Sequence, residues 1–469
     1  MLYVSTRGEA PAISFSDALL AGLARDGGLY VPERWPELSP ATIADFRGKS
    51  YAQVAFEVIR PFVAGSFRES ELSRMIGEAY ATFDDPAVAP LVPLGENEHL
   101  CELFHGPTLA FKDVAMQLLA RLMDHVLAER GERVTIVGAT SGDTGGAAVE
   151  AFRGRDRADM IMLFPDGRVS DVQRRMMTTA TEANIHAVAI DGTFDDCQAI
   201  VKALFNDHTF RDRVRMSGVN SINWARIVAQ TVYYFTAAVA VGAPDKRVRF
   251  AVPTGNFGDV FAGYVAAKMG LPIERLIVAT NVNDILTRAL ATGAYEPRAV
   301  VPTASPAMDI QVSSNFERLL FDASGRNAPA VKVMMNVLAK ERRFSLPADV
   351  LAKIRKLFSA ARADEAETVA TIRSVYAAQQ YALDPHTAVG VHVARQMKGE
   401  GSGPLIALST AHPAKFPDAV EAAIGVRPAL PARLSDLLDR PERIERLPAS
   451  AEAVARFVSE RSRAVGAVA

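Results

Sequence analysis

The stretch Phe104-His105-Gly106-Pro107-Thr108-Leu109-Ala110-Phe111-Lys112-Asp113 is the starting point for interpreting the chain. A Gly-Pro turn leads to Lys112, and apolar residues at helical spacing follow, so we expect Lys112 near a helix N-terminus. The helix dipole and the neighbouring Phe111 both disfavour an ammonium group, which lowers the pKa of the amine. A lysine in this position is a candidate for forming a Schiff base. A surface lysine whose stem lies along Phe111 explains this stretch alone at least as well.

Short apolar runs alternate with amphipathic helices from residue 91 onward. Continuous apolar runs between helices are typical of parallel strands that are buried on both faces, which predicts an α/β fold. Ligands of such sheets lie beyond the carboxyl ends of the strands, so the turns after the runs are the candidate site. The predicted strands are residues 133–137, 160–164, 185–190, 248–252, 276–279 and 404–408.

The segments on either side of these runs have different patterns. Residues 1–90 predict an N-terminal domain, in which Pro61 breaks the helical patterns between residues 45 and 81. Residues 325–380 predict a helical insertion without strands, made of helices 331–341, 346–363 and 364–379. We therefore divide the chain into 1–90, a catalytic domain 91–430 and a C-terminal arm 431–469, whose last helix Ser450 caps.

Composition excludes several classes of protein. A net charge of -2 over 469 residues provides none of the basic excess that nucleic-acid binding requires. The two cysteines, Cys101 and Cys197, cannot form a disulfide framework, and no ligand spacing predicts a metal site. The apolar stretch 227–243 is too short and too polar to cross a membrane, so we expect a buried helix. Without an apolar signal region at the N-terminus, we expect a cytoplasmic protein.

Two of the predicted strand-to-helix turns can bind anions. Residues 138–146 are small, with the hydroxyls of Thr140, Ser141 and Thr144 beside Asp143, and residues 253–259 contain Gly255, Asn256, Phe257 and Gly258. Small residues leave backbone amides open to a carboxylate or phosphate at the start of a helix. Helix capping is the structural alternative, by Thr140, Ser141 or Asp143 in the first turn and by Asp259 in the second.

Two further stretches contain polar groups where a ligand could bind. Residues 220–226 bring together Asn220, Ser221 and Arg226, and a guanidinium can bind phosphate through two hydrogen bonds. Residues 409–416 follow the last predicted strand, so the hydroxyl of Thr410 can point into the cleft. The alternatives are an N-capped helix with a surface arginine, and a turn hydroxyl that binds its own backbone.

These stretches together resemble the threonine synthase family, in the longer form that is found in microbes and fungi. The resemblance covers nearly the whole chain, through residues 3–8, 26–32, 104–113, 141–145, 220–223, 255–258, 307–310, 314–318 and 408–416. It implies a pyridoxal-phosphate-dependent fold of the tryptophan-synthase-β type (fold type II), with the cofactor between two parallel α/β subdomains. The smaller subdomain, roughly residues 113–225, would be mobile.

The resemblance also implies a role for each candidate residue. Lys112 would hold pyridoxal 5'-phosphate as a Schiff base and carry protons, and Thr410 would hydrogen-bond the pyridine nitrogen. Gly255, Asn256, Phe257 and Gly258 would bind the cofactor phosphate. Thr140, Ser141, Asp143 and Thr144 would receive the substrate carboxylate and flank the ring. Asn220, Ser221 and Arg226 match positions that bind the substrate phosphate in the shorter form of the family.

The implied reaction converts O-phospho-L-homoserine and water to L-threonine and phosphate, by γ-elimination followed by β-addition of water. The alternatives are a serine/threonine dehydratase-like lyase and an inactive protein that binds the cofactor or a phospho-ligand. At Asp143, relatives with this fold often carry asparagine, although the longer form of the family carries aspartate as this chain does. At Trp224, the shorter form usually carries proline. An ionised aspartate cannot donate a hydrogen bond to the cofactor, so the role of Asp143 stays open. We expect a monomer or a homodimer.

Overall fold

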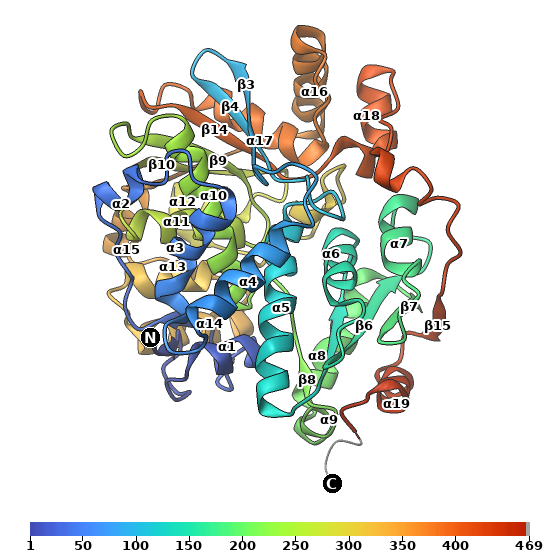
Figure 1. Cartoon of the computed structure of the whole chain (residues 1–469). Coiled ribbons are helices and arrows are strands. Elements are labelled where there is room, and N and C mark those ends of the chain that lie inside the picture. Colours follow the sequence, from blue (N-terminus) through green and yellow to red (C-terminus); the bar gives the residue numbers. More distant parts are fainter. Residues whose placement is uncertain (466–469) are drawn as a thin grey trace.

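The computed structural model describes residues 1–465, and a six-stranded sheet forms the larger of its two units (Figure 1). Neighbouring strands run parallel except for the antiparallel pair β3–β4 at one edge. In spatial order the strands are β13 (Phe358–Arg362), β10 (Ile273–Thr280), β9 (Val248–Pro253), β14 (Leu405–Ser409), β4 (Glu98–Glu102) and β3 (Leu91–Gly95). The predicted strands 248–252, 276–279 and 404–408 are confirmed.

A five-stranded parallel sheet forms the second unit, and its central strand β6 is buried at every residue, as expected for a sheet covered on both faces. The predicted strands 133–137, 160–164 and 185–190 are confirmed here. In spatial order the strands are β15 (Glu445–Pro448), β7 (Ile185–Asp191), β6 (Ala158–Pro165), β5 (Val134–Ala139) and β8 (Met216–Ser217).

Helices separate and cover the two sheets. Helix α10 (Trp224–Ala240) covers residues 227–240 of the predicted buried helix 227–243, and it packs on α5 (Lys112–Arg130) and α11 (Gly258–Lys268). No helix of residues 1–465 is both long and apolar enough to cross a membrane. The smaller unit contains α5 (Lys112–Arg130), α6 (Asp143–Phe152), α7 (Asp171–Thr178), α8 (Phe194–Asn206) and α9 (His208–Arg213). The larger contains α10 (Trp224–Ala240), α11 (Gly258–Lys268), α12 (Ile285–Thr292), α13 (Phe316–Ala323), α17 (Pro385–Gln396) and α18 (Pro417–Ile424).

The N-terminal region packs on the catalytic core through its helices. Helix α3 lies against α10, and α4 lies against α5 (Figure 1). The prediction that Pro61 breaks the helix is wrong, because α3 runs through Pro61 and ends two residues later. The elements are β1 (Tyr3–Ser5), α1 (Phe15–Ala21), β2 (Tyr30–Pro32), α2 (Pro40–Ala44), α3 (Tyr51–Val63) and α4 (Glu69–Tyr80).

The segment 325–380 is not purely helical, which corrects the prediction. The expected helix 346–363 stops at Arg355, and β13 follows as an edge strand of the six-stranded sheet, parallel to β10. Ala360 and Ala361 in this strand have high helix propensity, but pairing with the open edge of β10 overrides it. The helices are α14 (Ala328–Glu341), α15 (Ala348–Arg355) and α16 (Glu365–Gln379), with β12 (Phe344–Ser345) pairing β11 (Ala294–Tyr295).

The C-terminal arm joins the smaller unit. Strand β15 adds to the edge of the five-stranded sheet beside β7, and α19 (Ala451–Arg461) packs against α8 (Figure 1). The Ser450 hydroxyl accepts from the Ala453 amide at 3.3 Å, which confirms the predicted cap. The division into 1–90, 91–430 and 431–469 stays a prediction.

Candidate active site

The loop that ends at Lys112 is held by residues about 300 positions later in the chain. The Leu103 amide donates to the Ser409 carbonyl at 2.9 Å, and the Phe111 amide donates to the Thr410 carbonyl at 2.9 Å. The Lys415 amine donates to the Thr108 carbonyl at 2.8 Å. The carboxyl end of β14 therefore places the first residue of α5, which is Lys112 as predicted.

Lys112 is buried, with 8% of its surface exposed, so the surface-lysine alternative is wrong. Its Nζ lies 3.5 Å from Asp143 Oδ2 and 4.6 Å from the centre of the Phe111 ring. Burial lowers the pKa of Lys112. The charge of Asp143 opposes this effect, and the charges of Lys415 and Arg226 add to it. The amine is thereby shifted toward its neutral, nucleophilic form.

The first anion turn joins β5 to α6 without a side-chain cap, so capping by Thr140, Ser141 or Asp143 is wrong. Gly142 caps α6 with φ 147°, a conformation that favours glycine. The Thr140 hydroxyl instead accepts from the amides of Gly142 and Gly145, at 3.0 and 2.9 Å. Among residues 1–465, nothing accepts from the amides of 141, 143 and 144. These donors and the partly exposed hydroxyls of Ser141 and Thr144 suit a carboxylate.

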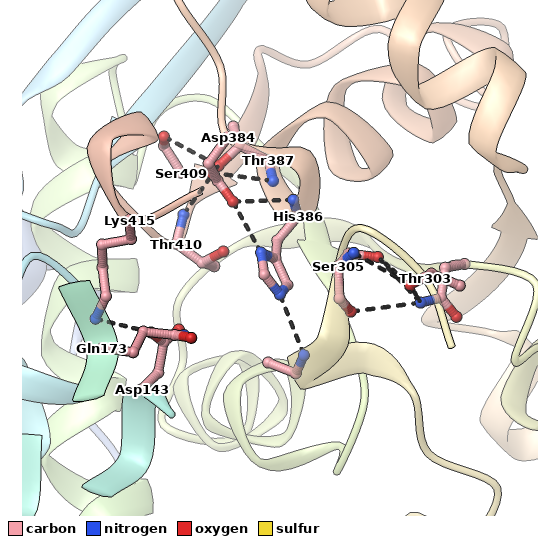
Figure 2. A network of polar contacts seen from close by, with 12 residues as sticks. Asp143, Gln173, Thr303, Ser305, Asp384, His386, Thr387, Ser409, Thr410 and Lys415 are labelled. Atoms are coloured by element: carbon pink, nitrogen blue, oxygen red, sulfur yellow. Dashed lines mark hydrogen bonds and ion pairs between the residues drawn. The ribbon is translucent and has the colours of Figure 1, made fainter. Parts of the chain in front are cut away.

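Asp143 is a buried ion-pair acceptor. Its Oδ1 lies 2.7 Å from Lys415 Nζ and accepts from Gln173 Nε2 at 2.9 Å, as Figure 2 shows. Burial alone would raise the pKa of Asp143, but the charges of Lys415 and Lys112 outweigh burial and hold it well below its usual range. The sequence did not identify Lys415 or Gln173 as site residues, although Lys415 lies within the stretch 408–416.

The second anion turn joins β9 to α11, and its amides are also free. Phe257 caps α11 with φ 63°, whereas the side chain of Asp259 accepts from the hydroxyls of Tyr233 and Tyr234, so capping by Asp259 is wrong. Within the described chain, no group accepts from the amides of 255–259. Gly255 is not in the left-handed region; it is required because a Cβ would lie 2.6 Å from the Ala307 carbonyl oxygen.

Asn256 ties the second turn to its neighbours. Its Nδ2 donates to Ser221 Oγ, and its Oδ1 accepts from the Ser314 amide at 2.7 Å. The Ser313 hydroxyl donates to the Gly255 carbonyl at 2.5 Å. The predicted residues Ser221 and Asn256 are thus brought together, whereas the side chain of Asn220 is exposed.

Arg226 is only 2% exposed, so the surface-arginine alternative is wrong. Its Nε has no hydrogen-bond partner, its Nη1 lies 3.5 Å from the Val219 carbonyl, and no carboxylate of residues 1–465 lies within 4.0 Å. Burial lowers the pKa of Arg226 to about 10. Trp224 is the first residue of α10, a position where proline is also common, so its presence leaves the helix start in place. An uncompensated buried guanidinium suits an anionic ligand.

A buried polar network supports Thr410, whose own hydroxyl has no partner within the described residues (Figure 2). The Thr410 amide donates to Thr387 Oγ1 at 3.2 Å, and the Thr387 hydroxyl donates to Asp384. His386 Nδ1 donates to Asp384 at 2.9 Å, and Nε2 accepts from the Ala307 amide at 3.2 Å. The sequence reasoning missed Asp384 and His386; an Asp-Pro pair at a helix start was the available signal.

Together, these groups fit one kind of ligand. They comprise a buried amine, two helix starts that offer free amides for anionic groups, a free hydroxyl and an uncompensated guanidinium. An aldehyde-bearing aromatic cofactor with a phosphate group satisfies the amine, one set of amides and the hydroxyl. A second anionic molecule would satisfy the other amides and Arg226.

Comparison with known proteins agrees with this donor set. The family model of pyridoxal-phosphate-dependent enzymes matches residues 89–409, and models for the N terminus and C-terminal part of threonine synthase match residues 2–80 and 387–458. The fold is therefore that of a pyridoxal-phosphate-dependent enzyme. The cofactor is pyridoxal phosphate, as the sequence predicted.

The relatives narrow this class. Threonine synthase of Pseudomonas aeruginosa is 54% identical over 98% of both chains, and that of Corynebacterium glutamicum is 43% identical over 98% of both. The crystal structure of PLP-bound threonine synthase from Brucella melitensis has a TM-score of 0.96 and 60% identity, and covers 99% of this chain and 100% of that one. The chain belongs to the threonine synthase family, which confirms the predicted family and fold.

One group of potential metal ligands lies away from the cleft. Glu71, His125 and Glu129 have ligand atoms within 4.8 Å of one another on α4 and α5. His125 is thirteen residues beyond Lys112 on one helix, which is about 20 Å. This group therefore has no part in the cleft, and metal-free chemistry stays a prediction.

Proposed function

We propose that the chain converts O-phospho-L-homoserine and water to L-threonine and phosphate, as a threonine synthase. Two observations support this reaction: the chain belongs to the threonine synthase family, and it aligns with members of that family over nearly their whole length. The observation that carries the proposal is the uncompensated, buried guanidinium of Arg226, whose charge influences the Lys112 amine. A substrate with its own phosphate group would supply the missing negative charge.

Lys112 is the catalytic residue of this proposal. Its amine binds the cofactor aldehyde, is released when the substrate amine takes its place, and then moves protons at the α- and β-carbons. When bound, pyridoxal phosphate supplies an electron sink for the negative charge that proton removal leaves. The low pKa of Lys112 suits both roles, because only the neutral amine can attack or accept a proton.

The two turns have separate tasks. The free amides of 255–259, with Gly255, Asn256, Phe257 and Gly258, bind the cofactor phosphate. The free amides of 141, 143 and 144 and the hydroxyls of Ser141 and Thr144 bind the substrate carboxylate, while Thr140 holds that turn in shape. Thr410 contributes a neutral hydroxyl to the pyridine nitrogen.

Ser221 and Arg226 would bind the substrate phosphate, with Asn220 at the exposed entrance. The phosphate leaves from the γ-carbon, and retention beside Arg226 would let it act as a base toward water. A serine/threonine dehydratase-like lyase, the second candidate, needs no such site. The fold of threonine deaminase from Solanum lycopersicum is similar, at a TM-score of 0.51 and 13% identity.

The deciding experiment measures phosphate and threonine released from O-phospho-L-homoserine by the purified protein. Equal amounts of both products support the proposal. Phosphate with a keto acid, or turnover of serine and threonine instead, would favour the lyase, and no turnover would favour an inactive binding protein. A cytoplasmic location, a monomer or homodimer, and a mobile segment 113–225 remain predictions.

A further inference from the structure

One buried carboxylate lies close to two buried amines. Asp143 Oδ1 lies 2.7 Å from Lys415 Nζ, whereas Asp143 Oδ2 lies 3.5 Å from Lys112 Nζ. Lys415 is fully buried, and its amine also donates to the Thr108 carbonyl at 2.8 Å. Lys415 therefore has two partners at normal hydrogen-bond distance, and Lys112 has one at the limit of hydrogen bonding.

The other charged groups near Lys112 do not compensate for a second ammonium. Arg226 on α10 adds another positive charge. Asp259 on α11 is held by Tyr233 and Tyr234, and burial raises its pKa to about 6. Asp143 is thus the one carboxylate in hydrogen-bond range of Lys112 among the described residues. A buried carboxylate offsets one positive charge, so only one of the two lysines can stay protonated at low cost.

We propose that Lys415 is a positioning residue, which occupies the Asp143 carboxylate and so keeps Lys112 available as a free amine for the cofactor. The pair joins the two units, because Asp143 begins α6 beside the five-stranded sheet and Lys415 follows β14 of the six-stranded sheet (Figure 2). It also gives Asp143 a role that asparagine could not have, since an uncharged amide would not offset the positive charge of Lys415. The inference rests on Lys112 as the cofactor lysine of the proposed function.

The first test titrates Lys112 in the full-length wild-type protein. The cofactor is removed with hydroxylamine and then restored in a parallel sample, to show that the fold survives. The rate of acetylation of each lysine is measured against pH by mass spectrometry. We expect the midpoint of Lys112 to lie below that of Lys268, a partly exposed lysine paired with Asp322. Equal midpoints would overturn the proposal without any mutation.

The second test uses Lys415→Met, which removes the charge and keeps the length of the side chain. Asp143 is then left with Lys112 alone, so the acetylation midpoint of Lys112 should rise by about one pH unit. At a pH below the midpoint, this rise means about tenfold less free Lys112 amine. Lys268→Met is the matched control and should leave the midpoint unchanged. In an Asp143→Asn background, Lys415→Met should raise the Lys112 midpoint less, because the competing carboxylate is gone and only the direct repulsion between the two amines is lost.

The outcomes separate this inference from the proposed function. Borohydride reduction followed by peptide mapping shows whether the cofactor is on Lys112, independently of any midpoint. A folded Lys415→Met protein with an unchanged Lys112 midpoint would overturn the positioning role, even if its melting temperature fell. If Lys415→Met does not fold, equal midpoints of Lys112 and Lys268 in the wild-type titration would still overturn the inference. Cofactor on another lysine would instead overturn the proposed function.

Discussion

The two anion turns of the cleft have the same plan but different surroundings. Both follow a parallel strand, both begin a helix, and both leave several amides without acceptors. The turn 138–146 is lined by hydroxyls and by the charged pair Asp143–Lys415. In the turn 253–259, the carboxylate of Asp259 accepts from the hydroxyls of Tyr233 and Tyr234, and the amides of 255–259 have no acceptor among the described residues.

This difference indicates what each turn can do. A turn made of backbone donors alone suits a group that stays bound throughout, since nothing in it has to change charge. A turn beside a charged network and Lys112 suits the part of the substrate that reacts, where protons move. The predictions below test this division of work, and the effect expected to be largest comes first.

Replacing Lys112 tests the part of the site where protons are expected to move. Lys112→Ala should lower turnover at least about a thousandfold, because the nucleophile and the proton carrier are lost together. The second turn should still retain the cofactor without a covalent bond, which equilibrium dialysis measures. Lys268→Ala is the control. Cofactor trapped on Lys268 or Lys415 of the wild-type protein would contradict the assignment.

Replacing Arg226 tests whether its guanidinium serves substrate or cofactor. Arg226→Ala should cost about 2–5 kcal/mol of transition-state binding, by analogy with buried charge pairs. At about 1.36 kcal/mol per tenfold, that is roughly a thirty- to several-thousand-fold loss in kcat/KM. In Arg226→Ala, the absorption spectrum of the bound cofactor and the affinity for the cofactor should not change. Arg213→Ala, at an exposed position, is the control and should not affect turnover. An equal loss of cofactor affinity would place Arg226 on the cofactor phosphate instead.

The two helix-start aspartates should respond to pH in opposite ways. Burial raises the folded-state pKa of Asp259 to about 6. As the pH rises, the unfolded chain therefore loses the Asp259 proton before the folded protein does, and the free energy of unfolding decreases between about pH 4 and 6. Asp259→Asn does not titrate and can still accept from both tyrosines. Its stability relative to wild type should therefore increase by about 2–3 kcal/mol from pH 4 to 7, measured by urea unfolding. Asp143→Asn should instead be destabilised at pH 7. If the stability of both variants relative to wild type changed with pH in the same direction, the proposed difference between the two turns would be wrong.

Crowding the second turn should have the smallest effect. Gly255→Val places a branched side chain against the Ala307 carbonyl, and overpacking of this kind costs about 1–3 kcal/mol. We expect roughly 5- to 150-fold weaker cofactor binding in a titration of the folded variant. Gly77→Ala in α4 is the control, because a Cβ there would meet no atom within 4 Å. Unchanged affinity would mean that the turn only caps α11.

The strands and the two anion turns could be predicted because their signals are local. An apolar run of five residues and the small residues after it are visible in sequence, and all six predicted strands are present. The strand β13 was missed because its alanines favour a helix locally, and only the edge of β10 makes it a strand.

The burial of Lys112 and Arg226 could not be derived in the same way. Each stretch fits a surface side chain equally well, and the choice depends on segments far away in sequence. The same holds for Lys415 with Asp143 and for His386 with Ala307, which are brought together by tertiary structure alone. Resemblance to a family supplied the roles of the predicted residues, but it did not indicate these partners.

The anchoring of the Lys112 loop by the end of β14 has a consequence for synthesis. Lys415 follows Thr108, its hydrogen-bond partner, by 307 residues. At about 5–20 residues per second, a ribosome adds this length in roughly 15–60 s. During the last part of that time, once residue 259 has been added, the nascent chain contains its reactive lysine and both glycine turns, but not the segment that holds them in register. The cleft can therefore form only after nearly all of the chain has been translated, and a prematurely terminated product would lack a cofactor site.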